Sequence, residues 1–397
     1  MNERPDILIS GGGVAGLVAA ATFGSAGFSV VCVDPAPPVT DAAAPGADLR
    51  TTAFLQPARA LLEEAGIWPR LAAEATALRT MRIVDAGGAV ARDFEAQELG
   101  DAPFGWNVPN WLMRREVLAR LEALPGVDFR SGTGFARMIT RTHEALVTLT
   151  DGTRLRPRLV LGADGRDSPV RAAAGIGART IRYGQKAITF AVTHAAPHDN
   201  ISTEIHRTGG PFTLVPLPDH EGRPCSAVVW MVPGPEARRL LDLAEPAFIA
   251  EATERSAGVL GALTLAAPRA SWPIIARVAE RMSAERTALM AEAAHVLPPI
   301  GAQGLNMSLA DLRCLLDLAR AAPETLGSRE MLDRYHRTRH PDILLRLAGI
   351  DALNRASIAG APGLQQLRAR GIEALWGLRP VRRTLMQLGL GAGADAT

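Results

Sequence analysis

The N-terminal segment alternates between apolar runs and a glycine-rich turn. Residues 7–10 form a short apolar run, residues 17–26 are small and mostly apolar, and residues 29–33 form a second apolar run that ends before Asp34. Short apolar runs bounded by glycine favour buried strands, whereas a longer run of small residues closed by Gly27 is typical of a helix. The pattern therefore predicts a strand, a helix and a second strand, in that order.

Two later segments repeat the order of strand, turn and helix. Residues 159–162 have the pattern of a buried strand, followed by a turn and by a helix start at Ser168 with proline in its first turn. The segment GAQGLN leads from a proline-rich turn into a helix that is predicted to begin near Asn306. Between these segments, ITFAVTH (188–194) and FTLVPLP (212–218) alternate as strands do.

The first glycine turn has the spacing of a dinucleotide-binding site. Gly11, Gly13 and Gly16 form a GxGxxG sequence between the predicted strand and helix. Glycine at these positions permits a tight turn, the close approach of a pyrophosphate and close helix packing. The phosphates would lie at the helix N-terminus, and Asp34 is placed to accept hydrogen bonds from ribose hydroxyls. This fingerprint leaves FAD and NAD both open.

Composition narrows the class of protein. With 397 residues, 47% of them hydrophobic, the chain is expected to form two closely joined globular domains. Its 43 basic and 41 acidic residues leave a net charge of +2, which is too small to indicate a nucleic-acid partner. Because no secretion signal and no apolar run of about 18 residues is visible, we expect a cytoplasmic protein that does not span a membrane. Cys32, Cys225 and Cys314 have no CxxC spacing and are expected to be reduced.

The histidines offer one candidate metal pair. His336 and His340 are i, i+4 neighbours, but arginines flank them and a third ligand is missing, so we expect no metal site. GxSxG, HExxH and Walker sequences are absent from the chain. Their absence is consistent with chemistry that a bound cofactor supplies.

Together with GxGxxG, two further motifs resemble the fingerprints of the class A flavoprotein monooxygenases. They are LVLGADGRDSPVR (159–171), which contains Asp164 and Gly165, and ALMAEAAHVLPPIGAQGLN (288–306). The resemblance covers roughly residues 5–320. It implies an α/β, para-hydroxybenzoate hydroxylase-like fold with a Rossmann-type FAD-binding domain, an inserted antiparallel β-sheet substrate domain and C-terminal helices. In this family the first motif binds the ADP half of FAD, the second lies near FAD and the nicotinamide nucleotide, and the third contacts the ribityl chain and flavin ring.

The finer resemblance is to the ubiquinone-biosynthesis hydroxylases. DLRTTAFLQPARALLEEAGIW resembles their arginine-containing segment and places Arg50 near FAD, while VPNWLMRREVLARL resembles the helix whose arginine, here Arg115, contacts the cofactor. GGPFTLVPLPDHEGRPCSAVVWMVP resembles a strand pair of their substrate domain. The resemblance implies hydroxylation of the aromatic ring of a polyprenylated phenol in ubiquinone biosynthesis, using NAD(P)H and dioxygen through a flavin hydroperoxide.

The resemblance also implies which residues serve the site. Pro299 and Gly304 are expected to form a catalytic floor under the flavin, mainly through backbone atoms. His295 is expected to pack or to hydrogen-bond structurally and not to act as a base. The expected cofactor-binding residues are Gly11, Gly13, Val14, Ala15, Gly16, Asp34, Arg50, Arg115, Asp164, Gly165, Glu292, Pro299, Gly301, Gln303, Gly304, Leu305 and Asn306.

The third motif departs from the family pattern at two neighbouring positions. Ala291 stands where the family usually has glycine, and Glu292 stands where many members have aspartate. If position 291 has a positive φ, alanine there costs up to about 1 kcal/mol or shifts the loop. Glu292 is expected to reach the ribityl hydroxyls through an adjusted contact.

The resemblance further implies a discontinuous cofactor domain. The expected division assigns residues 1–75, 103–181 and 268–320 to the FAD-binding domain, residues 76–102 and 182–267 to the substrate-binding sheet, and residues 321–397 to a C-terminal helical region. Within this last region, the helical spacing is interrupted by Pro341.

The C-terminal segment has a basic amphipathic pattern. LQQLRARGIEALWGLRPVRRTLMQLGLG mixes Leu, Ile and Trp376 with five arginines, namely Arg368, Arg370, Arg379, Arg382 and Arg383. Two interpretations stay open. The segment is either a helix that faces the core with a solvated arginine face, or a contact with an anionic membrane or with other quinone-biosynthesis proteins.

Two other functions stay open. The first is another flavoprotein of the same fold, such as a prenyl-lipid reductase, a halogenase or a small-phenol monooxygenase, although no halogenase-type WxWxIP run is visible. Consumption of dioxygen matched by hydroxylated product would exclude the reductase. The second is a non-catalytic FAD-holding accessory protein of a quinone-biosynthetic complex. A purified protein that stays colourless after FAD is added would favour this accessory function.

Overall fold

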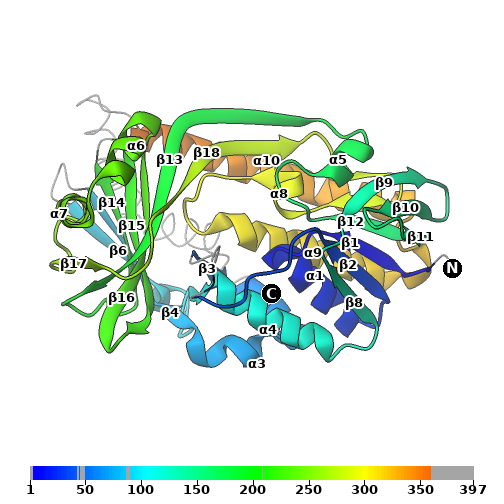
Figure 1. Cartoon of the computed structure of the whole chain (residues 1–397), viewed down its shortest axis with the longest axis horizontal. Coiled ribbons are helices and arrows are strands. Elements are labelled where there is room, and N and C mark those ends of the chain that lie inside the picture. The colour runs from blue at the N-terminus through cyan, green and yellow to red at the C-terminus, as the bar shows by residue number, and fades with distance from the viewer. Residues whose placement is uncertain (1–2, 43, 45–49, 86–89, 208, 359–397) are drawn as a thin grey trace.

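The computed structural model describes residues 3–42, 44, 50–85, 90–207 and 209–358. Helices and sheets form an elongated molecule with two sheet-containing regions at its two ends (Figure 1). The predicted α/β class is therefore confirmed. The basic amphipathic pattern that was predicted for the C-terminal segment lies outside the described residues.

The N-terminal strands belong to a six-stranded sheet that is almost entirely parallel. The parallel strands follow the order β8 (Val127–Ser131), β2 (Val30–Asp34), β1 (Ile7–Ser10), β12 (Leu159–Gly162) and β20 (Thr287–Leu289), and β19 (Ser283–Ala284) pairs antiparallel with β20. Every residue of β1 is buried. Parallel strands that are covered on both faces read as continuous apolar runs, which is why the sequence indicated them.

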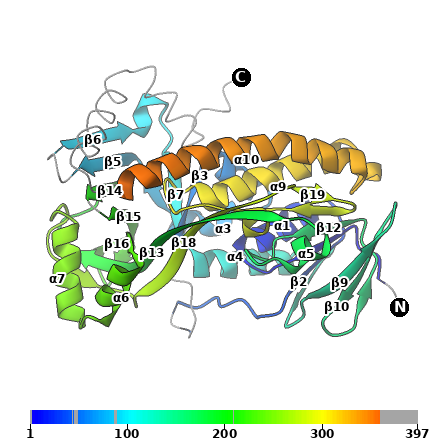
Figure 2. The same cartoon turned by 90° about the horizontal axis from the view of Figure 1, so that it is seen from above.

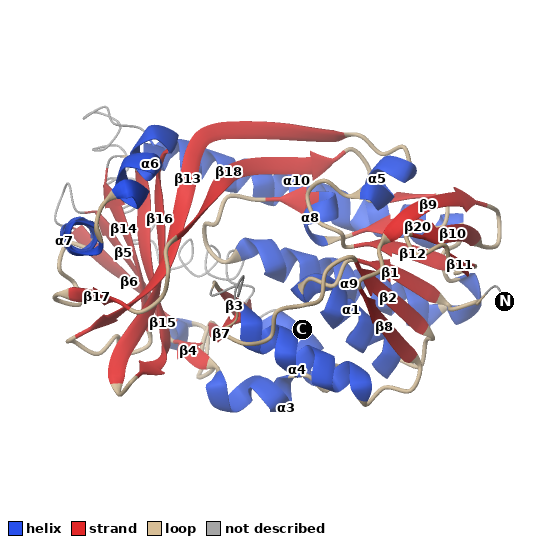
Figure 3. Cartoon of the chain, in the orientation of Figure 1, coloured by secondary structure: helices blue, strands red, loops and turns tan. Residues whose placement is uncertain are grey.

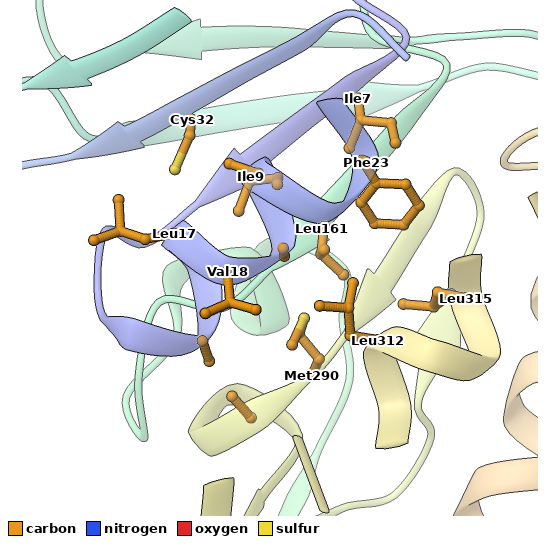
Figure 4. Packing of buried hydrophobic residues seen from close by; sticks show 14 of the residues in the cluster. Ile7, Ile9, Leu17, Val18, Phe23, Cys32, Leu161, Met290, Leu312 and Leu315 are labelled. Carbon is orange, nitrogen blue, oxygen red and sulfur yellow. The ribbon is translucent and has the colours of Figure 1, made fainter. Parts of the chain in front are cut away.

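Three helices cover this sheet, and their packing forms the main core. They are α1 (Val14–Ser25), α4 (Asn110–Glu122) and α9 (Gln303–Ala321). Residues 15–23 of α1 are all buried, as expected of a helix that is apolar all round. Side chains from α1, β1, β12 and α9, among them Ile9, Val18, Leu161 and Leu312, meet in this core with Met290, which follows β20 (Figure 4).

Two three-stranded sheets and several short helices complete this part of the fold. One three-stranded sheet contains β9 (Phe135–Thr140), β10 (Ala145–Leu149) and β11 (Arg154–Leu155), and the other contains β3 (Thr51–Leu55), β7 (Gly105–Pro109) and β4 (Thr76–Leu78). The short helices are α2 (Gln56–Glu64), α3 (Trp68–Leu71), η1 (Ala72–Glu74), η2 (Ala96–Glu98), α5 (Pro169–Ala173) and α8 (Ala291–Ala294). Ser168 caps α5 by accepting a hydrogen bond from the Arg171 N–H at 2.9 Å, so the helix start predicted at Ser168 is confirmed.

A large sheet, mostly antiparallel, forms the other end of the molecule (Figure 3). Its order is β21 (His295–Val296), β18 (Ala270–Ala279), β13 (Ala178–His194), β16 (Arg223–Pro233), β15 (Gly210–His220), β14 (Ile201–Arg207), β5 (Thr80–Asp85) and β6 (Val90–Glu95), and β17 (Leu263–Leu265) also pairs with β13. One face packs against α6 (Gly234–Asp242) and α7 (Glu245–Arg255) through Phe190, Phe212, Trp230 and Phe248.

The long strands β13 and β18 join the two regions (Figure 1). The predicted domain boundary at residue 181 falls within β13, and the boundary at residue 268 falls just before β18. Residue 181 lies within paired strand, so the structure marks no break there, whereas residue 268 lies in the short connection between β17 and β18. The division into domains stays a prediction.

The C-terminal part of the described chain is one long helix, α10 (Arg329–Ile358), preceded by η3 (Pro323–Thr325). It lies beside α9 along one side of the molecule (Figure 2). The expected interruption at Pro341 is wrong, because α10 continues through it. Proline costs a helix one backbone hydrogen bond, but neighbouring contacts hold this segment, since His340 Nε2 donates to the Ala279 carbonyl at 3.1 Å.

Two smaller results concern helices. Helix α9 begins at Gln303, three residues before the position predicted from the sequence. In the part of the chain that the structure describes, no helix combines the length and the apolar character needed to span a bilayer.

Candidate functional site

The three glycines of the first motif have different surroundings. Gly11 has φ +116°, and a Cβ built on it would lie 2.3 Å from the Ala163 carbonyl oxygen. A Cβ on Gly16 would lie 1.9 Å from the Gly11 oxygen, whereas a Cβ on Gly13 would meet no atom within 4 Å. Gly11 and Gly16 are therefore needed for packing inside the protein, and Gly13 borders open space at the start of α1.

Helices α1 and α9 begin without a side-chain cap, as α2 and α4 also do. The residue before α1 is Gly13 and the residue before α9 is Ala302, and neither provides a side-chain cap. Neither helix has an acidic residue in its first turn. The first N–H groups of a helix carry partial positive charge and need acceptors. Val14 and Ala15 at one end, and Gly304 and Leu305 at the other, are therefore suited to an anionic or polar ligand.

Asp34 closes the first motif at the end of β2. Its Oδ2 accepts a hydrogen bond from the Gly12 N–H at 2.5 Å, and its Oδ1 accepts one from the Ala36 N–H at 2.9 Å. These bonds hold the carboxylate beside the glycine turn. Each carboxylate oxygen can accept a further bond, so this position suits ribose hydroxyls, although the ribose contact itself stays a prediction.

The second motif contributes a half-buried carboxylate with one unused oxygen. Asp164 Oδ2 accepts hydrogen bonds from Ser10 Oγ at 3.3 Å and from the Val170 N–H at 3.1 Å. Its Oδ1 is buried and has no partner among the described residues. Burial raises the pKa of Asp164 above the usual value, although bonds from Ser168, Val170 and Ser10 oppose the effect. A buried acceptor without a partner is costly, which suggests that a ligand donates to it.

Replacement of Asp164 by Asn is expected to stabilise the cofactor-free protein at neutral pH. A carboxyl with a raised pKa favours the folded state while it is protonated, and this contribution is lost as pH rises through the folded-state pKa. Asn keeps an oxygen acceptor but cannot ionise, so the Asp164→Asn variant should exceed the wild type in unfolding free energy at pH 7. The difference should shrink as pH falls toward 3.8, the ordinary pKa of aspartate. Urea unfolding of the apoprotein between pH 4 and pH 8 measures this difference. A variant that is less stable at every pH would contradict the prediction.

Arg171 joins the second motif to the third. Its two terminal nitrogens donate to the carbonyl oxygens of Ala293 and Arg166, both at 2.8 Å, and the residue is buried. The Met290 N–H also donates to the Gly162 carbonyl at 3.0 Å. Since Gly11 abuts Ala163 and Ser10 bonds to Asp164, the structure brings all three motifs into one place. The sequence offered no signal for the role of Arg171, because its partners are backbone carbonyls.

Ala291 has the conformation on which its predicted cost depended. Its φ is +54°, in the left-handed region that favours glycine. Ala291 is buried at the start of α8, so the strain lies directly beside Glu292.

The Ala291→Gly variant is therefore expected to be more stable than the wild type by up to about 1 kcal/mol, since glycine adopts this φ without strain. Ala257→Gly is the matched control, because Ala257 has φ +53° but lies between α7 and β17. Denaturant unfolding should show a gain for both variants, while FAD affinity should change only for Ala291→Gly. A loss of stability in both variants would contradict this interpretation of the strain.

Glu292 lies at the predicted place but has a protein partner. Its carboxylate accepts a hydrogen bond from Arg166 Nε at 3.3 Å, and its side chain is 49% exposed. The two residues therefore link the second and third motifs at the surface. Contact between Glu292 and the ribityl chain stays a prediction.

The segment from Pro299 to Asn306 is a loop that leads into the first turn of α9, next to β3 and the large sheet. Asn306 Nδ2 donates to the Ala53 carbonyl at 2.7 Å, and Asn306 Oδ1 accepts a bond from the Leu55 N–H at 2.9 Å. Ile300 packs with residues of the large sheet and α10, namely Ala187, Met231, Ile274 and Ile350. Pro299 and Gly304 are exposed, and a Cβ on Gly304 would meet no atom within 4 Å. The loop thus presents backbone to open space, as a floor for a planar ligand would.

The two predicted arginines have different positions. The Arg50 guanidinium lies 4.5 Å from the centre of the Trp272 ring on β18, so it spans the gap between β3 and the large sheet. Arg115 lies on α4, where its Nε donates to Glu116 at 2.8 Å and its guanidinium lies 5.3 Å from the Trp111 ring centre. Both partners of Arg115 belong to its own helix. Its contact with the cofactor stays a prediction.

His295 and His336 form hydrogen bonds within the protein, and the cysteines form no disulfide. His295 Nε2 donates to Asp311 at 2.6 Å in a buried position. His336 accepts a bond from the Met282 N–H at 3.3 Å, and its ring centre lies 4.8 Å from that of His340. In the described ranges no group of three or more His, Cys, Asp or Glu residues is arranged to hold a metal ion. The three cysteines are unpaired.

These features fit FAD. The N-termini of α1 and α9 have no side-chain caps and provide partial positive charge, and the unused oxygen of Asp164 provides an acceptor. Open space at Gly13 and Gly304 leaves room for a dinucleotide beside these groups. Helix α1 would hold the pyrophosphate and Asp34 the ribose. The 299–306 loop would hold the flavin.

Comparison with known proteins agrees with this geometry. A sequence profile of the family described as "FAD binding domain" matches residues 4–344. Ubiquinone hydroxylase UbiL of Rhodospirillum rubrum is 34% identical over 394 residues, which cover 97% of this chain and 89% of that protein. The 3-demethoxyubiquinol 3-hydroxylase of Escherichia coli is 27% identical over 402 residues, which cover 98% and 99% of the two chains.

A solved structure has the same fold. The crystal structure of p-nitrophenol 4-monooxygenase PnpA from Pseudomonas putida DLL-E4 matches with a TM-score of 0.81 and 18% sequence identity, over 100% of both chains. At this identity the likeness concerns the fold alone. The predicted para-hydroxybenzoate hydroxylase-like fold is confirmed.

Proposed function

Because the chain belongs to the FAD binding domain family, among the class A flavoprotein hydroxylases of ubiquinone biosynthesis, we propose that it hydroxylates the aromatic ring of a polyprenylated phenol. FAD is its cofactor, and NAD(P)H and dioxygen are its co-substrates. The relatives named for ubiquinone hydroxylation cover nearly the whole chain, which supports this substrate class over a small phenol.

One observation carries the proposal. The three sequence motifs, which are more than a hundred residues apart, meet through Gly11, Asp164, Arg171 and Glu292 around two uncapped helix N-termini. Glycine-rich turns that served only the local fold would not need to lie next to one another. Bound FAD would supply the activation of dioxygen for transfer of one oxygen atom to the phenol ring.

The residues of this chain would bind the flavin, orient the substrate and exclude water. The N–H groups at the start of α9 favour negative charge at the flavin. Leu297 and Ile300 belong to one apolar cluster with Ala187, Val229 and Met231, so the loop meets the large sheet through apolar side chains. Apolar surroundings of this kind suit a prenylated ring and keep water away from the reacting atoms.

The finer assignments belong to the same proposal. The cofactor residues are those of the three motifs together with Arg50 and Arg115. The substrate-binding region is the large sheet formed by residues 76–102 and 182–267. The basic segment from Arg368 to Arg383 would contact an anionic membrane surface or another quinone-biosynthesis protein. Such a contact would bring the enzyme to a substrate with an apolar tail.

Quinone analysis of a strain that lacks this gene tests the proposal. The mutant should accumulate a ubiquinone precursor that lacks one ring hydroxyl, and a plasmid with the wild-type gene should remove it. If the quinones of the mutant are unchanged, the biosynthetic assignment is wrong. If the precursor accumulates but the purified protein binds no FAD, the chain is an accessory protein and not the hydroxylase.

A further inference from the structure

Helix α10 presents a row of alternating charges to the third motif. Arg339, Asp342 and Arg346 are at i, i+3 and i+7, which places them on one face of the helix. Arg339 Nη1 donates to Asp342 Oδ2 at 2.8 Å, and Arg346 Nε donates to Asp342 Oδ1 at 3.0 Å. The row is therefore continuous along two turns of α10.

At the N-terminal end of this charged row, Arg339 is linked to His295, where the segment from His295 to Gln303 begins. Arg339 Nε donates to Asp311 Oδ1 on α9 at 2.8 Å, and His295 Nε2 donates to the other oxygen of Asp311 at 2.6 Å. Exposure of the three side chains is 10% or less. Charge-assisted bonds of this kind are strong when they are buried. Both oxygens of Asp311 are paired, whereas the buried Nδ1 of His295 has no partner among the described residues. Arg339 thus fixes Asp311, and Asp311 fixes the residue that follows α8.

At the C-terminal end of the charged row, Arg346 is linked to Gln303, where the same segment ends. Arg346 Nη1 donates to Gln303 Oε1 at 3.2 Å, and Gln303 Nε2 donates to the Gly301 carbonyl at 3.0 Å. Gln303 is buried at the first position of α9. Through these bonds one face of α10 holds both ends of the segment from His295 to Gln303.

The segment held in this way contains an unusual turn. Gly301 has φ +65° and Ala302 has φ +55°, so two successive residues are left-handed immediately before α9. Alanine is strained in this region, and such strain persists only where surrounding contacts enforce it. The bond from Gln303 to the Gly301 carbonyl closes this turn, and Arg346 fixes the amide of Gln303. The turn in turn sets the direction of the first N–H groups of α9.

We propose that Arg346, with Arg339, is a positioning residue for the flavin. Arg346 acts through Gln303 and does not itself touch the cofactor. It holds the left-handed turn at Gly301 and Ala302, and thereby aims the N–H groups of Gly304 and Leu305. This inference rests on the proposed FAD site and adds a role for α10, outside the three motifs.

Arg346→Met tests the inference, because the change removes the bond to Gln303 but leaves an apolar stem of similar length. The FAD dissociation constant of the apoprotein should rise about tenfold, which corresponds to about 1.4 kcal/mol. The visible absorption bands of the remaining bound flavin should shift. Arg346→Lys keeps one donor and should give an intermediate affinity. Arg337→Met is the matched control, since Arg337 is an exposed arginine of the same helix, and it should bind FAD as the wild type does.

The melting temperature of the apoprotein separates positioning from general stability. It should be nearly equal in the wild type, Arg346→Met and Arg337→Met. If Arg346→Met binds FAD with wild-type affinity and spectrum, or loses affinity only in proportion to a lowered melting temperature, the inference is wrong. If wild-type apoprotein binds no FAD, the proposed function fails instead, so the two failures are distinguishable.

The Arg346→Met change in an Ala302→Gly background tests whether Arg346 acts through the left-handed turn. Ala302→Gly removes the strain of the left-handed turn, so the turn should depend less on Arg346. The loss of FAD affinity caused by Arg346→Met should then be smaller in the Ala302→Gly background than in the wild type. An equal fold-loss in both backgrounds would contradict a role through this turn.

Discussion

Gly304→Leu is expected to weaken FAD binding strongly while the apoprotein stays folded. Gly304 is the second residue of α9, it is exposed, and a Cβ there would meet no atom within 4 Å. A side chain there therefore starts into open space, and leucine is a better helix former than glycine by up to about 1 kcal/mol. Its side chain would instead occupy the space proposed for the flavin. We expect the FAD affinity to fall by roughly two orders of magnitude, or about 2.8 kcal/mol.

The matched control for this change is Gly349→Leu. Gly349 is an exposed glycine inside α10, and a Cβ there also meets no atom within 4 Å. Both variants gain the same helix propensity, so their apoproteins should unfold at or above the wild-type denaturant concentration. Flavin fluorescence titration should show normal binding for Gly349→Leu alone. Normal affinity and a normal flavin spectrum in Gly304→Leu would show that the 299–306 loop is not the flavin floor.

Gly16→Ala is expected to destabilise the protein itself. A Cβ on Gly16 would lie 1.9 Å from the carbonyl oxygen of Gly11, which is backbone and cannot move aside cheaply. Helix α1 would have to shift away from β1, where both elements are fully packed. Overpacking of this kind typically costs 1–3 kcal/mol, and we expect a loss of about 3 kcal/mol, since the clash is with backbone.

Gly13→Ala provides the comparison, because a methyl group there meets nothing within 4 Å. Its apoprotein should be as stable as the wild type, but its FAD affinity should fall, since the methyl group would enter the space proposed for the pyrophosphate. Urea unfolding of both apoproteins, together with FAD titration, gives the two quantities separately. If Gly16→Ala were as stable as Gly13→Ala, the close contact between Gly16 and Gly11 would be wrong.

Local signals in the sequence predicted much of the fold and site. The strand at residues 7–10 and the helix that begins after Ser168 depend on neighbouring residues, and the structure has both. The condition of a positive φ at position 291, which was based on the glycine usual in the resembling family, is also met. A buried parallel strand is apolar along its whole length and a helix start carries a capping side chain, so both leave a readable pattern.

Features that depend on distant partners were not readable. Arg171 binds carbonyl groups of Arg166 and Ala293, and Arg346 binds Gln303 across 43 residues. An arginine in a helix looks the same in the sequence whether it is solvated or holds a loop in place. Pro341 misled the prediction for the same reason, because tertiary contacts around α10 outweigh the lost backbone bond.

The most direct test of the account is the source of the oxygen atom in the product. Purified protein with FAD, NAD(P)H and a polyprenylated phenol should be incubated under ¹⁸O₂, and the product analysed by mass spectrometry. We predict a hydroxylated phenol that carries one ¹⁸O atom, with the Gly349→Leu variant active and the Gly304→Leu variant inactive. A product without the label, or NAD(P)H consumption without any hydroxylated phenol, would contradict the proposed hydroxylase function.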